Sequence, residues 1–280
     1  MMSQIKKEKA PYLVCVDSDG CAIDSMESKH RECFGPALID TLGLINMQEV
    51  MDLWLHINLY SKWRGINRYQ GFWQMIMTLK KRYSKQELSM YDAFGHWVET
   101  THMFSMDALK QEMEKNHDLG MKKVHGWSRD VNNRIETMQK KSKLFEHVQP
   151  CLKVMSKHAD IFVVSSANHD AIDKEWKALG IAPFVQLIGG QEYGKKEDFI
   201  KGLIEQGYDA NQALMIGDAP GDMRAAAQNH IRFYPIQPQD EGWSWGMLKD
   251  KIFEELLHNH DDSNDYLEAV KRYKITLGLE

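Results

Sequence analysis

Apolar and polar residues follow two different patterns along the chain, and each pattern predicts its own kind of structure. Residues 12–16 form a continuous apolar run that ends in the polar turn Asp17-Ser18-Asp19-Gly20, which is typical of a buried strand. From residue 150 onward, short apolar runs alternate with helical segments. The predicted strands are 161–164, 184–188, 213–216 and 231–234, and the predicted helices are 150–159, 169–179, 197–206 and 221–229. This strict alternation indicates a parallel sheet covered by helices.

Residues 25–145 lack any strong alternating run, and their only proline is Pro36, so we predict helices almost throughout. Ser84 and Ser105 are candidate helix caps, and the many methionines and tryptophans are expected to fill the core of a helical bundle. The strand at 12–16 is apolar on both faces and needs the later sheet. We therefore predict an α/β core domain, residues 1–24 and 146–280, and an inserted helical domain, residues 25–145. Two amphipathic helices expected in 237–280 would pack on the core.

Composition and charge narrow the class of protein. The chain has 280 residues, of which 43% are hydrophobic and 27% charged, as in an ordinary globular protein with room for two domains. A net charge of −5 argues against a general nucleic-acid binder, and no segment has the pattern of a signal peptide or a membrane span. The four cysteines lack zinc-site spacing and are expected to be buried free thiols. We expect a cytoplasmic protein, a monomer or homodimer, that binds neither nucleic acid nor membrane.

Polar residues that are able to carry chemistry follow the predicted strands. Because the carboxyl ends of parallel strands meet at one edge of a sheet, we expect these side chains to lie together. Each has a simpler explanation alone, as a turn, a helix cap or a solvated lysine, and only their joint order favours catalysis. They are Asp17 and Asp19 after 12–16, Ser165 and Ser166 after 161–164, Lys195 and Lys196 after 184–188, and Asp218 and Asp222 after 213–216.

Such a cluster predicts a site for a phosphoryl group. Clustered carboxylates repel one another and need a cation, and their oxygen ligands suit Mg²⁺ better than Zn²⁺. A metal, a lysine and a hydroxyl together would receive the phosphoryl oxygens. One carboxylate would attack phosphorus, and a second, two residues on, would protonate the leaving group and then activate water. The sequence has neither the dinucleotide-binding GxGxxG pattern nor a P-loop.

The order of these motifs resembles the haloacid dehalogenase (HAD) superfamily. DSDG, VVSS, GKKEDFI and GDAPGD resemble its four motifs, which span residues 12–222 here. The helical insertion resembles a cap domain of the C1 class, close to the branch of phosphoglycolate phosphatase and β-phosphoglucomutase. The resemblance implies a Rossmann-like parallel-sheet core with an inserted all-helical cap, and a Mg²⁺-dependent phosphatase that acts on a small phosphorylated metabolite.

The resemblance also implies a role for each motif residue. Asp19 is the residue that favours a phosphate ester, because the dehalogenase branches lack it. Substrate contacts are also implied for Ser166 and for whichever of Lys195 and Lys196 is not the motif lysine. Asp17 is implied as nucleophile and Mg²⁺ ligand, and Asp19 as general acid and base whose backbone carbonyl also binds the metal. Ser165 is implied to bind the phosphoryl group, and Lys196 or Lys195 to neutralise its charge. Asp218 is implied as a metal ligand, and Asp222 as a residue just outside the direct ligands of the metal.

Substrate specificity is expected to come from the helical insertion. Arg64 and Arg68 are four residues apart, so in a helix they would share one face and clamp an anionic substrate. The alternative is a solvated basic face. Two other functions stay open: a phosphomutase of the β-phosphoglucomutase type that uses the same Asp17, and a non-catalytic HAD-like binding protein.

Overall fold

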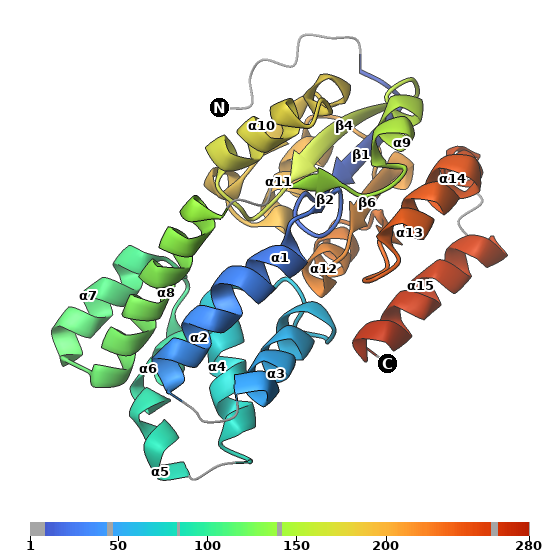
Figure 1. Ribbon diagram of the computed structural model, residues 1–280. Helices are drawn as coiled ribbons and strands as arrows, with labels where there is room; N and C mark the ends of the chain where they lie inside the picture. The colour runs from blue at the N-terminus through green and yellow to red at the C-terminus, as the bar shows by residue number, and fades with distance from the viewer. Residues whose placement is uncertain (1–8, 44–46, 83–84, 139–141, 259–262, 280) are drawn as a thin grey trace. The chain divides into compact units, whose positions relative to one another are not determined.

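The chain divides into two compact units. The computed structural model describes residues 9–43, 47–82, 85–138, 142–258 and 263–279. We call residues 1–25 with 142–280 the core unit, and residues 26–141 the helical unit (Figure 1). The helical unit is thus an insertion between the first strand of the core unit and the rest of its sheet.

The core unit is built on a five-stranded parallel sheet with the strand order β5-β4-β1-β6-β7. The central strand β1 pairs with β4 on one side and β6 on the other, so that Val14 lies opposite both Ile161 and Leu214. The fold class is α/β, as predicted. The strands are β1 Tyr12–Val16, β4 Ala159–Val164, β5 Leu187–Gly189, β6 Ala213–Gly217 and β7 Arg232–Pro235.

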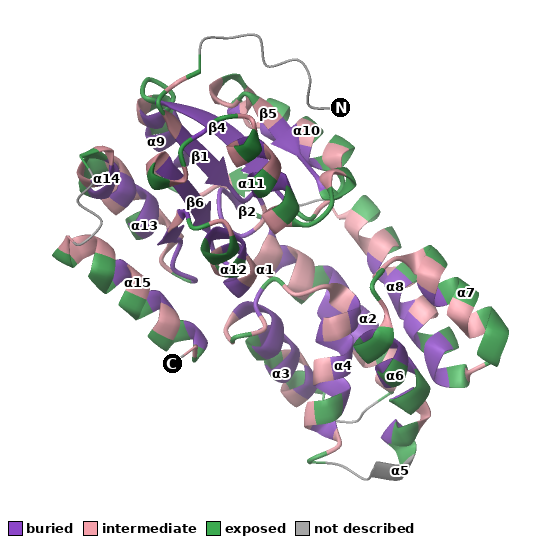
Figure 2. Ribbon diagram, turned by 180° about the vertical axis from the view of Figure 1, so that it is seen from behind, coloured by how far each residue is buried: buried purple, intermediate pink, exposed green. Residues whose placement is uncertain are grey.

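Helices cover both faces of this sheet, because alternate residues of each strand point to opposite faces. Val14 and Val16 belong to one apolar cluster, together with residues of α9, α10, α13 and α14. Leu13 and Cys15 belong to the opposite cluster, with residues of α11 and α12. The buried strands between exposed helix faces are visible in Figure 2. The helices are α9 Val148–Met155, α10 His169–Ala178, α11 Lys196–Glu205, α12 Pro220–Gln228, α13 Glu241–Met247, α14 Phe253–Leu257 and α15 Asn264–Leu277.

A tight turn follows β1 and leads toward the helical unit. The backbone N–H groups of Ala22 and Ile23 both donate to the carbonyl of Ser18, at 3.0 Å each, and Gly20 takes a φ of 80°. Glycine adopts this left-handed conformation without a Cβ clash. A short antiparallel pair then joins β2, Ile23–Asp24, to β3, Lys143–Leu144, where the chain leaves and re-enters the core unit.

The helical unit contains only helices and loops among its described residues, as the sequence predicts. Aromatic rings form its core: Trp54 meets Trp127 edge to face at 5.8 Å between centroids, and Phe72 lies 4.9 Å from Trp127. Ser105 caps α7 as expected, accepting a hydrogen bond from the Ala108 N–H at 3.1 Å, whereas Ser84 lies outside the described residues. The helices are α1 Met26–Lys29, α2 Gly35–Leu42, α3 Met47–Leu59, α4 Arg68–Leu79, α5 Lys85–Leu88, α6 Asp92–Thr100, α7 Met106–Asn116 and α8 Leu119–Thr137.

Three details of the predicted organisation are wrong. The strand expected at 184–188 begins only at Leu187, because residues 182–184 form a 3₁₀ turn. The helix expected at 150–159 ends at Met155, and Ala159 already belongs to β4. The methionines of the insertion do not all fill its core, since Met47 and Met103 are 61% and 67% exposed.

Among the described residues, no helix has the length and apolarity that a bilayer crossing requires.

Candidate active site

Asp17 stands at the carboxyl end of the central strand. Its backbone N–H donates to the carbonyl of Ile216 at 2.9 Å, so the pairing of β1 with β6 extends one residue beyond the strand. Its side chain is only 9% exposed. In a doubly wound sheet, ligands bind outside the carboxyl ends of the central strands, and Asp17 lies there.

Lys196 is the cation that reaches Asp17. It is the first residue of α11, and its Nζ lies 2.8 Å from Asp17 Oδ1 and 2.6 Å from Asp222 Oδ1. Only 13% of its side chain is exposed, whereas Lys195, which precedes the helix, is exposed. Of the two lysines that the sequence left open, Lys196 therefore enters the cluster.

Asp222 is held at both carboxylate oxygens. Oδ1 accepts from Lys196, and Oδ2 accepts from the backbone N–H of Ala219 at 3.0 Å, which caps the start of α12. A Cβ on Gly217 would lie 2.3 Å from Asp222 Oδ2, so a glycine is needed where the chain passes this carboxylate. Asp222 thus positions Lys196 as much as it adds charge.

Three carboxylates share a buried space around this lysine. One oxygen each of Asp17, Asp218 and Asp222 lies within 4.8 Å of the others, and all three residues are buried. Like charges about 5 Å apart repel by about 3 kcal/mol at an effective dielectric constant of about 20. Three ionised carboxylates and one ammonium would leave two negative charges in excess (three minus one), which one divalent cation would neutralise.

Burial dominates the ionisation of the cluster. It raises the pKa of Asp17 well above its usual value, and the charges of Asp222 and Asp218 raise it further, while Lys196 opposes them. Burial lowers the pKa of Lys196, but the charges and hydrogen bonds of Asp17 and Asp222 outweigh burial and raise it, so the lysine stays an ammonium. A bound cation would favour the ionised form of Asp17.

The donors in the cluster fit a hard cation. They are carboxylate oxygens, the ligands that Mg²⁺ prefers. The nearby Cys21 offers no thiolate, because burial and then the neighbouring carboxylates raise the pKa of its thiol. The cluster therefore suits Mg²⁺ better than Zn²⁺.

The other motif residues contact groups outside this cluster or are exposed. Asp19 lies outside the group of three carboxylates and accepts a hydrogen bond from the Ser25 hydroxyl. Ser165 is buried, and its Oγ accepts from the Ala167 N–H at 3.3 Å, whereas Ser166 is exposed.

The two arginines of the helical unit do not share a helix face. Arg64 lies in a turn before α4, is 4% exposed, and donates to the carbonyl of Leu59 at 2.8 Å. Arg68 begins α4 and donates from Nη1 to Asn132 Oδ1 at 2.7 Å, with its guanidinium 5.1 Å from the centre of the Phe34 ring. Both guanidinium groups contact acceptors within the helical unit.

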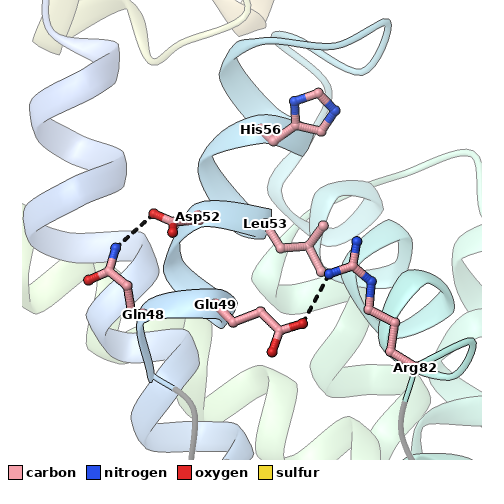
Figure 3. Close-up of a pocket in the computed structure, with 6 residues that line it drawn as sticks. All are labelled: Gln48, Glu49, Asp52, Leu53, His56 and Arg82. Atoms are coloured by element: carbon pink, nitrogen blue, oxygen red, sulfur yellow. Dashed lines mark hydrogen bonds and ion pairs between the residues drawn. The ribbon is translucent and has the colours of Figure 1, made fainter.

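A hollow of about 470 Å³ lies within the helical unit, beside α3. Its polar side chains contact one another: Arg82 forms an ion pair with Glu49 at 3.0 Å, and Gln48 donates to Asp52 at 2.8 Å (Figure 3). None of the residues expected from the sequence to act at a site lines it. It is lined by Gln48, Glu49, Asp52, Leu53, His56 and Arg82.

Three aromatic side chains that the sequence analysis did not single out contact the loops of the site. Trp176 Nε1 donates to Ser18 Oγ at 2.9 Å, Trp245 Nε1 donates to the carbonyl of Cys21 at 2.8 Å, and the Tyr273 hydroxyl donates to the carbonyl of Asp218 at 3.2 Å. No spacing rule links them to the motifs, because these contacts join residues 55 to 224 positions apart.

The core unit thus combines a parallel sheet of this order with a lysine-bridged carboxylate cluster at the carboxyl end of its central strand. The family model for haloacid dehalogenase-like hydrolases matches residues 66–236, more than half of the chain. The chain belongs to this family. The match includes Ser165, Lys196, Asp218 and Asp222, while Asp17 and Asp19 precede it, in the turn after β1.

Solved structures share the fold at low sequence identity. A predicted phosphoglycolate phosphatase from Haemophilus somnus is 14% identical, with coverage of 81% of this chain and 85% of that chain and a TM-score of 0.51. A protein from Lactobacillus delbrueckii with the same provisional assignment is 14% identical, with coverage of 96% and 99% and a TM-score of 0.52. Comparison with curated proteins gives no match.

Proposed function

We propose that this protein is a Mg²⁺-dependent phosphatase that hydrolyses a small phosphorylated metabolite through an aspartyl phosphate on Asp17. The observation that carries the proposal is the ammonium of Lys196 between Asp17 and Asp222, with the Asp218 carboxylate in the same buried cluster. Membership of a hydrolase family supports it. Asp19, two residues beyond the nucleophile, supplies the acid that a phosphate ester needs.

In the first step, the Asp17 carboxylate attacks phosphorus, a new P–O bond forms, and the ester P–O bond breaks. Asp19, protonated at this stage, gives its proton to the leaving alkoxide, which departs as an alcohol. Lys196 neutralises charge on the transferring group, and Ser165 donates a hydrogen bond to one of its oxygens. Because Lys196 is already held between two carboxylates, little reorganisation is needed when this charge develops.

In the second step, water attacks the phosphorus of the aspartyl phosphate. Asp19, now a carboxylate, accepts the proton of that water, the bond between phosphorus and Asp17 breaks, and inorganic phosphate leaves. The enzyme returns to its starting state with Asp17 ionised and Asp19 protonated. Atoms and charge therefore balance over the two steps.

The carboxylates of Asp17 and Asp218 and the backbone carbonyl of Asp19 are the groups that would hold Mg²⁺. A bound Mg²⁺ supplies positive charge that draws the phosphoryl oxygens toward the nucleophile and lowers their repulsion of it. Asp222 acts through Lys196 and the start of α12. We place the reaction in the cytoplasm, where four unpaired buried thiols stay reduced.

Release of phosphate from a panel of small phosphoesters tests this function. The panel contains phosphoglycolate, sugar phosphates and nucleotides, each incubated with Mg²⁺ and with EDTA. Asp17→Asn should lower kcat by at least about a thousandfold while the protein stays folded. Asp198→Asn, which changes an exposed carboxylate on α11, is the matched control and should keep its activity. Activity retained by purified Asp17→Asn would remove Asp17 from the role of nucleophile.

The products separate this proposal from its alternatives. Rearranged sugar phosphate without net phosphate release would identify a phosphomutase that uses the same Asp17. If neither product forms from any ester, and Asp17→Asn binds phosphorylated ligands as the wild type does, a binding protein becomes the better description.

A further inference from the structure

The segment 237–280 lies beyond the residues that match the family model, which end at 236. We propose that this segment is part of the active-site scaffold, with Trp245 and Tyr273 as positioning residues for the two carboxylate-bearing loops. The inference deepens the proposed function and rests on it for the identity of the site. It concerns only the core unit, to which every residue in the argument belongs.

Helix α15 packs against the edge strand β7, and the described helices of the segment reach both faces of the sheet. Trp245 of α13 belongs to the apolar cluster on one face, and Tyr273 of α15 belongs to the cluster on the other. In Figure 1, α13 to α15 run from orange to red along one side of the core unit. Both aromatic side chains are fully buried, at 0% exposure. One C-terminal segment thus contributes a buried donor on each face.

Buried hydrogen bonds fix this segment to the end of the sheet. Gln237, 1% exposed, donates from its backbone N–H to Ser244 Oγ at 2.9 Å and from its side chain to the carbonyl of Ala269 at 2.7 Å. The Tyr234 hydroxyl donates to the carbonyl of Ser244 at 2.8 Å. These contacts join β7, α13 and α15 and give the two aromatic donors a rigid support.

Tyr273 acts on the peptide unit that follows Asp218. The carbonyl of this unit accepts from the Tyr273 hydroxyl at 3.2 Å, and its N–H, which belongs to Ala219, donates to Asp222 Oδ2 at 3.0 Å. One peptide plane is therefore held at both ends, by the C-terminal helix and by a residue of the cluster. Its orientation sets the direction in which the Asp218 side chain leaves the backbone.

Trp245 acts on the loop that carries Asp17 and Asp19. Its indole N–H donates to the carbonyl of Cys21 at 2.8 Å, at the far end of the turn that closes on Ser18. Three carboxylates that repel one another need backbone supports, and Trp245 and Tyr273 of the C-terminal segment supply two of them. Loosening either support should let the carboxylates move apart before a cation binds.

Two single-group substitutions test the proposal. Tyr273→Phe and Trp245→Phe each remove the donor and keep an aromatic ring. The matched controls are Tyr266→Phe on the same helix α15, whose hydroxyl donates to the carbonyl of Phe233 at 3.0 Å, and Trp243→Phe on the same helix α13, whose ring stacks on Arg272. Each control removes the same group from the same helix, at a contact with β7 for Tyr266 and with Arg272 for Trp243.

The first measurement is amide hydrogen exchange by mass spectrometry, which needs no metal and no substrate. Exchange should accelerate in the peptide covering 217–222 for Tyr273→Phe and in the peptide covering 17–22 for Trp245→Phe, and in neither peptide for the controls. The second measurement is Mg²⁺ titration by calorimetry. The dissociation constant should rise roughly three- to tenfold in Tyr273→Phe, the range that one lost hydrogen bond allows, and stay unchanged in Tyr266→Phe.

The outcomes separate this inference from the proposed function. Unchanged exchange in both loop peptides, or equal changes in variants and controls, overturns the positioning roles even if the protein is a phosphatase. A wild type that binds no Mg²⁺ and releases no phosphate overturns the proposed function, and exchange then still decides whether the C-terminal segment supports the two loops.

Discussion

At the scale of single residues, the chemistry of the site depends on one cation among several anions. Lys196 is buried and contacts two carboxylates at 2.8 and 2.6 Å. Removing one partner of a buried ion pair leaves a desolvated charge and costs more than the pair contributes to stability. The neighbouring Lys195 has the same side chain in an exposed position. The two lysines therefore provide a matched test of burial.

Lys196→Met should destabilise the protein by about 3–5 kcal/mol in EDTA, because Asp17 and Asp222 then lack their counter-charge. Lys195→Met should change stability by less than about 0.5 kcal/mol. Denaturation with urea in EDTA measures both values. Equal stabilities of the two variants would contradict the view that the buried ion pairs organise the cluster.

At the scale of elements, Arg68 joins the start of α4 to α8. Its Nη1 contacts Asn132 Oδ1 at 2.7 Å, and the Ser128 hydroxyl and carbonyl lie at 3.4 and 3.5 Å. Burial lowers the pKa of Arg68 from its ordinary value, a sign that its charge sits among protein groups instead of in water. The structure thus gives this arginine a role within the helical unit, beside the substrate contact expected from the sequence.

Arg68→Ala should lower the free energy of unfolding by about 2 kcal/mol, because partly buried hydrogen bonds to a charged group are lost. Arg129→Ala, an exposed arginine on α8, is the control and should stay near the wild-type value. Thermal unfolding and steady-state kinetics on the same samples check both roles. A raised KM with unchanged stability would contradict the structural role and would support a substrate contact for Arg68.

Tyr91, between α5 and α6, should make the stability of the protein depend on pH in the alkaline range. Burial raises its pKa from 10.0 to about 12. The unfolded chain therefore loses the phenol proton first, and the contribution of Tyr91 to stability is complete below pH 10 and is lost as the pH rises to about 12. Two pKa units correspond to at most about 2.7 kcal/mol. Tyr91→Phe should flatten the fall in stability between pH 10 and 12, measured by urea denaturation, and an identical slope in variant and wild type would be the contrary result.

At the scale of the whole molecule, binding of a cation to the folded cluster should stabilise the protein against unfolding. The unfolded chain does not hold Asp17, Asp218 and Asp222 within 4.8 Å of one another, so the cation binds the folded state preferentially. Mg²⁺ at one hundred times its dissociation constant should add about 2.7 kcal/mol, and EDTA should remove the effect. Asp218→Asn should respond much less, whereas Asp198→Asn should respond as the wild type does. Thermal unfolding with and without Mg²⁺ measures the shift, and an equal shift in both variants would place the cation elsewhere.

The alternation of apolar runs and helices was enough to predict the strands at 12–16, 161–164 and 213–216 within one or two residues, because each is a short apolar run that ends in a turn. The strand expected at 184–188 begins only at Leu187, because the residues before it follow a 3₁₀ turn that ends at Phe184. A short apolar run in the sequence does not distinguish a turn that packs on the core from a strand that pairs in the sheet. The helical nature of the insertion was predictable, while the exposure of Met47 and Met103 was not, since a methionine fits either place.

The sequence by itself determined the order of polar residues after the strands, and therefore which carboxylates, hydroxyl and lysines approach one edge of the sheet. Only the tertiary structure decided which of Lys195 and Lys196 points into the cluster, since the rotation of α11 on the sheet buries one and exposes the other. It also decided that Arg64 and Arg68 lie on different elements, and that Trp245 and Tyr273 reach the site loops. These outcomes depend on packing between segments far apart in the chain, and local spacing carries no information about such contacts.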